Sequence, residues 1–154
     1  MAAARSSMIE VCVFRFAGNR PEYLLLRRVD DEPLYPGLWQ YITGSLEEGE
    51  RAADGALREL REETGFVPVG FWRAPYVHSF YDDRYDAIQA VPLFAAQAAP
   101  GQAPRLSAEH DEFLWLSAGE ASRKLVWPGQ REGLRIVHEE IAGGREAAKY
   151  SRIY

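Results

Sequence analysis

One 23-residue segment, Gly44 to Phe66, constrains this chain more than any other part of the sequence. It begins with a glycine, and a second glycine, Gly65, is a natural stop for a helix. Between them an apolar stripe recurs at helical spacing, formed by Ala53, Ala56, Leu57 and Leu60. The segment therefore predicts a loop followed by a helix over Glu50–Thr64, with one face packed against the rest of the protein.

The same helix carries a cluster of acidic residues. Glu59, Glu62 and Glu63 stand at positions i, i+3 and i+4, so they share one helix face. The segment holds six Glu and one Asp against three Arg, and like charges this close repel one another. A solvated Glu/Arg face is the alternative, but several carboxylates side by side suit a hard cation such as Mg²⁺ or Mn²⁺, which orients polyphosphates.

The spacing of the whole segment is more specific than the acidic cluster. It fits the pattern G-x5-E-x7-R-E-U-x-E-E-x-G-U, where U is a bulky aliphatic or aromatic residue. All nine specified positions are filled, by Gly44, Glu50, Arg58, Glu59, Leu60, Glu62, Glu63, Gly65 and Phe66. The segment resembles the box of the Nudix hydrolases. The resemblance implies an α/β fold, a Nudix-type α/β/α sandwich with a mixed β-sheet, a Mg²⁺ or Mn²⁺ cofactor, and hydrolysis of a nucleoside diphosphate linked to a variable group.

The resemblance also implies roles for the box residues. Glu59 and Glu63 are expected as metal ligands, and Glu62 as a direct or water-mediated ligand that also takes part in catalysis. Glu50 is expected either to join the metal site or to pair with Arg58. Arg58 is expected to serve catalysis by orienting carboxylates rather than by touching the substrate.

The residues before the box point to a subgroup. A Trp39-Gln40 pair, two further residues and Thr43-Gly44-Ser45 are similar to the run in bacterial dihydroneopterin triphosphate and dATP pyrophosphohydrolases. This similarity favours Trp39 and Gln40 as substrate-binding residues. The alternative is an aromatic strand whose Trp39 packs in the core.

A second acidic segment, Ser107–Glu112, precedes an apolar strand. The same arrangement occurs in that subgroup and in diadenosine tetraphosphate hydrolases, and it implies that Glu109 reaches the metal site and acts as a base. Asp111 and Glu112 compete for this role, and a solvated acidic loop is the alternative. His110 is expected as a helper or structural residue, because Mg²⁺ favours oxygen ligands.

Three further residues are candidates for binding the substrate. Arg27 and Arg28 end the second predicted strand near the expected box loop, where one of them can pair with a phosphate. A salt bridge at the sheet edge is the alternative. Tyr81 lies in an aromatic cluster and can stack on a base.

The remaining apolar runs complete a mixed pattern of strands and helices. Strands are predicted at Ile9–Phe16, Tyr23–Arg28, Leu38–Ile42, Phe71–Phe80, Ala87–Ala96 and Glu112–Leu116, and later helices at Ala118–Leu125 and Gly129–Ile141. The 154 residues fit one domain. We expect a flexible leader over residues 1–7, a Nudix domain over 8–145 and a tail over 146–154.

Composition narrows the possible partners and compartment. The net charge of −5 argues against a nucleic-acid polymer as partner. No apolar run has the length of a membrane span, and the N-terminus lacks a secretory segment. A single cysteine, Cys12, excludes an internal disulfide and a Cys-based zinc cluster. These features predict a cytoplasmic protein that binds a small-molecule nucleotide, with a homodimer expected by analogy.

Together these features predict a pyrophosphohydrolase of a nucleoside triphosphate-type substrate, either dATP or another NTP, or a dihydroneopterin triphosphate-like compound. It would release pyrophosphate or a monophosphate. One alternative is a hydrolase of dinucleoside polyphosphates or ADP-sugars. An alternative of another class is a non-catalytic Nudix module that binds nucleotides for regulation.

Overall fold

Two apolar runs form the centre of the sheet. The computed structural model describes residues 2–154, in which the runs form β2 (Met8–Ala17) and β3 (Arg20–Arg28). Successive residues of β3 point to opposite sides, so Leu24 and Leu26 join one buried cluster and Tyr23 and Leu25 the other. A strand that is apolar on both faces must be covered on both faces, which requires helices on each side of the sheet.

The sheet is mixed, as predicted. Its strand order is β1-β7-β2-β3-β4, with β5, β6 and β8 paired to β2, β7 and β3. β7 runs parallel to β1 and β2, and the other pairs are antiparallel. The remaining strands are β1 (Ala3–Arg5), β4 (Trp39–Gln40), β5 (Ile42–Ser45), β6 (Gly70–Asp82), β7 (Ala87–Gln97) and β8 (His110–Leu116).

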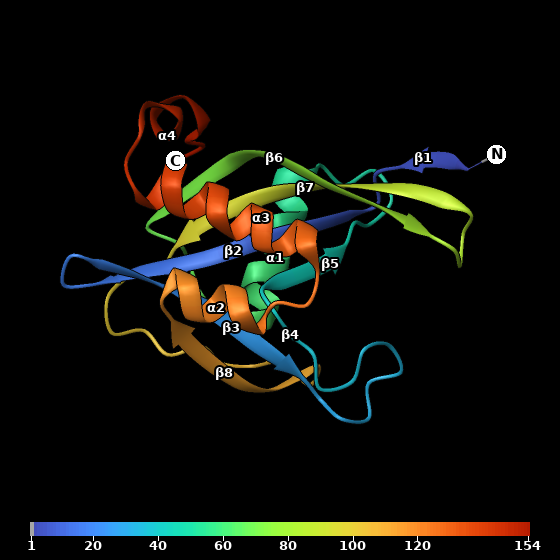
Figure 1. Cartoon of the computed structure of the whole chain (residues 1–154), viewed down its shortest axis with the longest axis horizontal. Helices are drawn as coiled ribbons and strands as arrows, with labels where there is room; N and C mark the ends of the chain where they lie inside the picture. Colours follow the sequence, from blue (N-terminus) through green and yellow to red (C-terminus); the bar gives the residue numbers. More distant parts are fainter. Residues whose placement is uncertain (1) are drawn as a thin grey trace.

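Helices cover both faces of this sheet (Figure 1). On one face, α1 (Ala52–Thr64) buries Ala56 and Leu60. The other face is covered by α2 (Ala118–Lys124), α3 (Pro128–Ile136) and the π-helix η1 (Val137–Ala142). This arrangement confirms the predicted α/β/α sandwich. Within residues 2–154, no helix is both long and apolar enough to cross a membrane.

Residues 3–5 and the C-terminal segment, which lie in the ranges expected as leader and tail, both pair with the sheet. The strand β1 pairs with β7, although Met1 lies outside the described residues. The C-terminal segment forms α4 (Glu146–Ser151) and then a backbone bond from Phe71 N to Tyr154 O of 2.7 Å. Backbone pairing at a free sheet edge needs no side-chain pattern, so the sequence carries little sign of it.

The observed elements differ from the predicted ones in their boundaries, and three of the differences involve the box helix or the division of a predicted element. The helix α1 begins at Ala52 rather than Glu50, because the Glu50 side chain accepts a bond from the backbone N–H of Glu47 and so closes the preceding turn. The predicted strand Leu38–Ile42 divides into β4 and β5, which pair with different neighbours. The last predicted helix divides into α3 and η1.

Candidate active site

The helix α1 places the three box glutamates in different environments. Glu59 and Glu63 lie one helical turn apart and are buried, with exposed fractions of 9% and 4%. Glu62 keeps 54% of its side chain exposed. Gly44 in β5 makes this possible, because a Cβ atom there would overlap the carboxylate of Glu59. The close approach of the two elements therefore needs glycine at this position.

Arg58 connects several of the box carboxylates. Its Nε and Nη2 atoms donate to the two oxygens of Glu50 at 2.8 and 2.9 Å, and its Nη1 atom donates to Glu59 at 2.8 Å. A weaker contact of 3.3 Å reaches Glu62, and Nη2 also donates to the carbonyl of Ser45. Arg58 and the Glu47 backbone N–H lower the pKa of Glu50 to about 2. The pair with Arg58 is one of the two roles expected for Glu50, and its place in a metal site stays a prediction.

The start of β8 and the loop before it fix the orientation of Glu63. The Oε2 atom of Glu63 accepts a bond from Ser107 Oγ at 2.9 Å and lies 2.7 Å from His110 Nδ1. Gln40 Nε2 lies 3.1 Å from the other ring nitrogen of His110. A carboxylate oxygen only accepts, so Nδ1 carries the proton that it donates to Glu63. The hydrogen bond to Glu63 is the physical basis for the helper role expected of His110. Ser107, the other donor to Glu63, was not a candidate from the sequence.

Three groups lie close enough to share a cation. The side chains of Glu63, Glu109 and His110 each offer an atom within 4.8 Å of the others. Burial, and then the charge of Glu63, raises the pKa of Glu109. Burial also raises the pKa of Glu59, although Arg58 acts against it. These carboxylates are crowded and partly desolvated, and the positive groups around them do not balance their negative charge. Their chemistry therefore fits a hard divalent cation.

The pKa of Glu63 shifts in the opposite direction. Burial alone would raise this pKa, but hydrogen bonds from His110 and Ser107 lower it below the ordinary value for Glu. Glu63 is therefore held in its charged form next to Glu109. Metal ligands in proteins are commonly held by such outer partners.

The candidate arginines are engaged in ion pairs. Arg27 donates to Asp30 at 2.6 Å and to both oxygens of Asp111. Arg28 pairs with Glu32 at 2.9 Å and donates to the carbonyl of Leu34. Arg28 lines the large cavity described below, and Arg27 does not.

The candidate aromatic residues lie in two different places. Trp39 packs against the core beneath α2, with Lys124 Nζ 5.0 Å from its ring centre. Tyr81 is exposed at the cavity and donates to Asp86 at 3.1 Å. Gln40 also lines the cavity, although it is buried and contacts His110. The structure thus brings Gln40 and Tyr81 to the cavity but not Trp39.

A cavity of about 1350 Å³ joins the acidic cluster to a second polar group. Glu59 and Glu109 lie along its wall, as do Glu10, His78 and Gln130. This volume is ample for a nucleotide-sized molecule. The cavity therefore has room for a ligand that reaches both groups.

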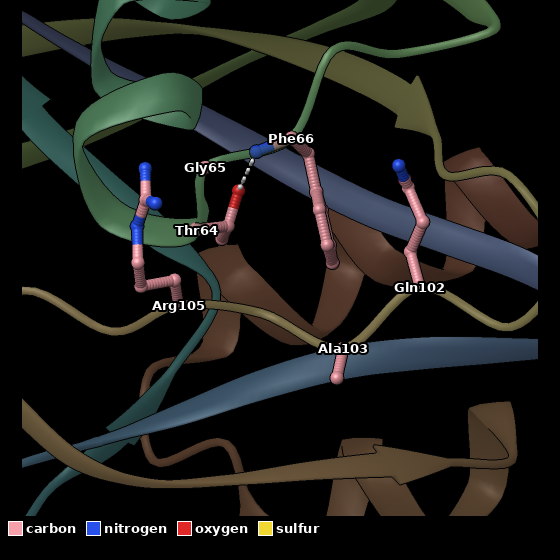
Figure 2. A pocket seen from close by; sticks show the side chains of 6 residues that line it. All are labelled: Thr64, Gly65, Phe66, Gln102, Ala103 and Arg105. Atoms are coloured by element: carbon pink, nitrogen blue, oxygen red, sulfur yellow. Dashed lines mark hydrogen bonds between the residues drawn. The ribbon is translucent and has the colours of Figure 1, made fainter.

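A smaller pocket of about 220 Å³ lies at the end of α1 and shares no residue with the large cavity (Figure 2). There Thr64 Oγ1 donates to the Leu60 carbonyl at 2.6 Å and accepts from the backbone N–H of Phe66 at 3.1 Å. Gly65 adopts a φ of 74°, which favours glycine. Gly65 of the box thus serves backbone shape, whereas Phe66 packs in the core against Trp115.

Comparisons with known proteins agree with this geometry. The NUDIX domain family matches residues 7–136. The octanoyltransferase of Myxococcus xanthus is 35% identical over 134 residues, which are 82% of this chain but only 35% of that protein. The nucleoside triphosphatase NudI of Escherichia coli is 27% identical over 125 residues, covering 77% of this chain and 89% of the relative.

A solved structure shows the same fold. The dihydroneopterin triphosphate pyrophosphohydrolase of E. coli superimposes with a TM-score of 0.69 over 88% of this chain and 96% of that one, at 23% identity. The chain belongs to the Nudix family. For this domain, the match confirms the predicted family, the fold class and the enzyme class of Nudix hydrolase. Enzymes of this family use divalent metal ions, in agreement with the crowded carboxylates.

Proposed function

We propose that this protein hydrolyses a pyrophosphate linkage in a nucleoside triphosphate-type substrate, releasing pyrophosphate or a monophosphate. The observation that carries the proposal is the position of Glu59 and Glu109 on the wall of a cavity large enough for a nucleotide. Crowded carboxylates repel a polyphosphate unless a cation lies between them. The acidic cluster and an anionic substrate are therefore compatible only in a metal-dependent reaction.

Glu59, Glu63 and Glu109 are the residues that would hold the cation, with Glu62 on the exposed side as a direct or water-mediated ligand. Mg²⁺ or Mn²⁺ would supply positive charge that offsets and orients the polyphosphate. Arg58 and His110 would act as positioning residues, because they contact Glu59 and Glu63.

Glu109 is the residue best suited to act as base. Glu109 lies on the cavity wall and close to Glu63, where it would be within reach of a water molecule held at the acidic site. A water molecule would attack phosphorus, the bond from phosphorus to the bridging oxygen would break, and the proton of the water would move to Glu109. The exposed carboxylate of Glu62 is the competing base.

A phosphate-release screen tests this proposal. The panel contains dATP, the common NTPs, dihydroneopterin triphosphate, ADP-ribose and diadenosine tetraphosphate, each with Mg²⁺ or Mn²⁺, with and without added pyrophosphatase. Release that requires pyrophosphatase identifies pyrophosphate as the product. Preferential turnover of ADP-ribose or diadenosine tetraphosphate would favour the ADP-sugar or dinucleoside polyphosphate alternative instead.

The alternative of a regulatory module makes a different prediction. A module of that kind would bind nucleotides with metal but turn none of them over, and calorimetry on the same panel would detect this. A homodimer and a cytoplasmic location stay predictions from the sequence. Light scattering at several protein concentrations tests the first of these.

A further inference from the structure

Glu10 is a carboxylate at a position where the strand pattern demands an apolar residue. In β2, Ile9 and Val11 point toward α1, whereas Cys12 continues the opposite face, to which Glu10 belongs. Glu10 is only 3% exposed. A charged group is rarely buried without a specific function or full pairing, so its partners decide which of these applies.

The partners of Glu10 leave acceptor capacity unused. His78 Nδ1 lies 2.8 Å from Oε1, and Gln130 Nε2 donates to Oε2 at 2.8 Å. A carboxylate offers about four lone-pair positions, so these two bonds leave about half of them free. The Oε1 atom of Gln130 is buried and accepts no hydrogen bond from the described residues 2–154. A buried acceptor without a partner calls for an explanation, and a ligand that donates is one.

The fold places this group on the same cavity as the acidic cluster, although its side chain lies on the sheet face opposite α1. Glu10 pairs across the sheet with Thr43, the residue before the glycine that packs on Glu59. The ring of His78 lies against Gly129 at the start of α3, where any Cβ atom would collide with it. Glu10, His78 and Gln130 line the cavity that also reaches Glu59. A single nucleotide could thus place its phosphates at the acidic cluster and its ring at Glu10.

We propose that Glu10 and Gln130 recognise the 2-amino-4-oxopyrimidine edge of the substrate, a proposal that rests on the function proposed above. Two neighbouring acceptors are complemented by an edge with two neighbouring donors, here a ring N–H beside an exocyclic amine. In adenine and cytosine the amine stands next to a ring acceptor, and in uracil the N–H lies between two carbonyls. A site of buried acceptors rejects such edges, because its own groups are left unpaired.

Guanine nucleotides and reduced pterins share this edge, so the test must distinguish them. We would measure kcat/KM for GTP, ITP, UTP and dihydroneopterin triphosphate. ITP is the matched probe because it lacks only the 2-amino group. We expect GTP to exceed ITP by about tenfold or more, which is the range for a lost hydrogen bond to a charged group. Whichever of GTP and dihydroneopterin triphosphate has the higher kcat/KM shows whether the recognised edge belongs to a guanine nucleotide or to a reduced pterin.

The variant Glu10→Gln removes the charge with little change of shape. We expect the ratio of GTP to ITP to fall to within about threefold, mainly through a higher KM for GTP. Glu139→Gln is the matched control, because this carboxylate pairs with Arg135 and does not line the cavity. It should retain the ratio of the unmodified protein. Equal kcat/KM for GTP and ITP in the unmodified protein would overturn the proposal.

Calorimetric binding of GMP and IMP separates this inference from the proposed hydrolysis. Tighter binding of GMP, lost in Glu10→Gln, supports the inference even if no triphosphate is turned over. Turnover of triphosphates without any preference for GMP over IMP overturns the inference and leaves the hydrolysis standing. If circular dichroism shows that Glu10→Gln does not fold, the comparison of GMP with IMP in the unmodified protein decides alone.

Discussion

The ring of His110 donates from Nδ1 to Oε2 of Glu63 at 2.7 Å, and both side chains are buried. This contact joins the first residue of β8 to the box helix α1. It explains how a residue type disfavoured as a ligand for Mg²⁺ nevertheless belongs to the acidic site. The imidazole orients the carboxylate and stabilises its charged form, as outer partners of metal ligands do elsewhere.

Replacing His110 should therefore weaken metal binding more than it weakens substrate binding. For His110→Ala we expect the Mn²⁺ concentration at half-maximal activity to rise about 10- to 100-fold, with partial recovery in excess metal. Titration of activity against Mn²⁺ measures this shift. Ser107→Ala, which removes the second bond to Glu63, should shift the midpoint in the same direction by less. An unchanged midpoint in both variants would refute the positioning role.

Glu63→Gln should leave the fold intact and reduce turnover by about 100-fold or more. An amide retains the shape of the carboxylate but not its charge, and each lost tenfold corresponds to about 1.4 kcal/mol of the barrier. Steady-state rates with metal in excess measure the effect. Glu48→Gln is the control, because Glu48 is exposed in the loop before α1. Normal turnover in Glu63→Gln would exclude this residue from the metal site.

Gly44→Ala should reduce activity through Glu59. The added methyl group would overlap the Glu59 carboxylate, which must then move. We expect turnover to fall by at least about tenfold, since small displacements of catalytic groups cost rates of this order or more. The control is Gly119→Ala in α2, where the nearest atom to a Cβ is 3.7 Å away. That variant should keep its activity and gain a few tenths of a kcal/mol in stability.

Arg58→Lys should destabilise the protein. An ammonium group cannot form the forked pair with Glu50 and also reach Glu59 and Ser45. Because these groups are partly exposed, we expect a loss of about 1–3 kcal/mol in the free energy of unfolding. Urea denaturation measures it. Stability equal to that of the unmodified protein would show that Arg58 does not organise the box.

Glu120 should contribute to stability at neutral pH but not at low pH. In the capping box at the start of α2, Ser117 Oγ and its backbone N–H donate to Glu120 and lower its pKa below the ordinary 4.5. This contribution is complete above pH 4.5 and disappears as the pH falls through the lowered pKa. We would measure the free energy of unfolding by denaturation at about pH 6 and about pH 3. The change in this free energy between the two pH values should be smaller for Glu120→Gln than for the unmodified protein.

Several features of the fold could be read from local sequence because they depend on local repetition. The alternating and continuous apolar runs predicted the positions of β2, β3, β6 and β7, since burial on a face repeats along the strand. The apolar stripe and Gly65 likewise predicted α1 to within two residues. The edge strand β1 and the contacts of the C-terminal segment use backbone pairing, which leaves no comparable pattern.

The site shows the same division. The spacing of the box made Glu59 and Glu63 candidates, and the resemblance of the loop before Phe113 made Glu109 one; the structure brings Glu63 and Glu109 close together and places Glu59 and Glu109 on one cavity. The sequence alone could not decide whether Arg27 binds phosphate. Arg27 pairs with Asp30 in the next loop and with Asp111 in a strand 84 residues further on, and the second of these contacts depends on the tertiary structure.

The sequence by itself determined the family, the helix and the carboxylates of the box, because each is encoded within one continuous segment. Only the tertiary structure decided which groups act together. It paired Glu63 with His110, 47 residues away, and Glu10 with His78 and Gln130, up to 120 residues away. These contacts arise because the sheet and α3 fix their positions in space, and no local spacing in the chain records such distances.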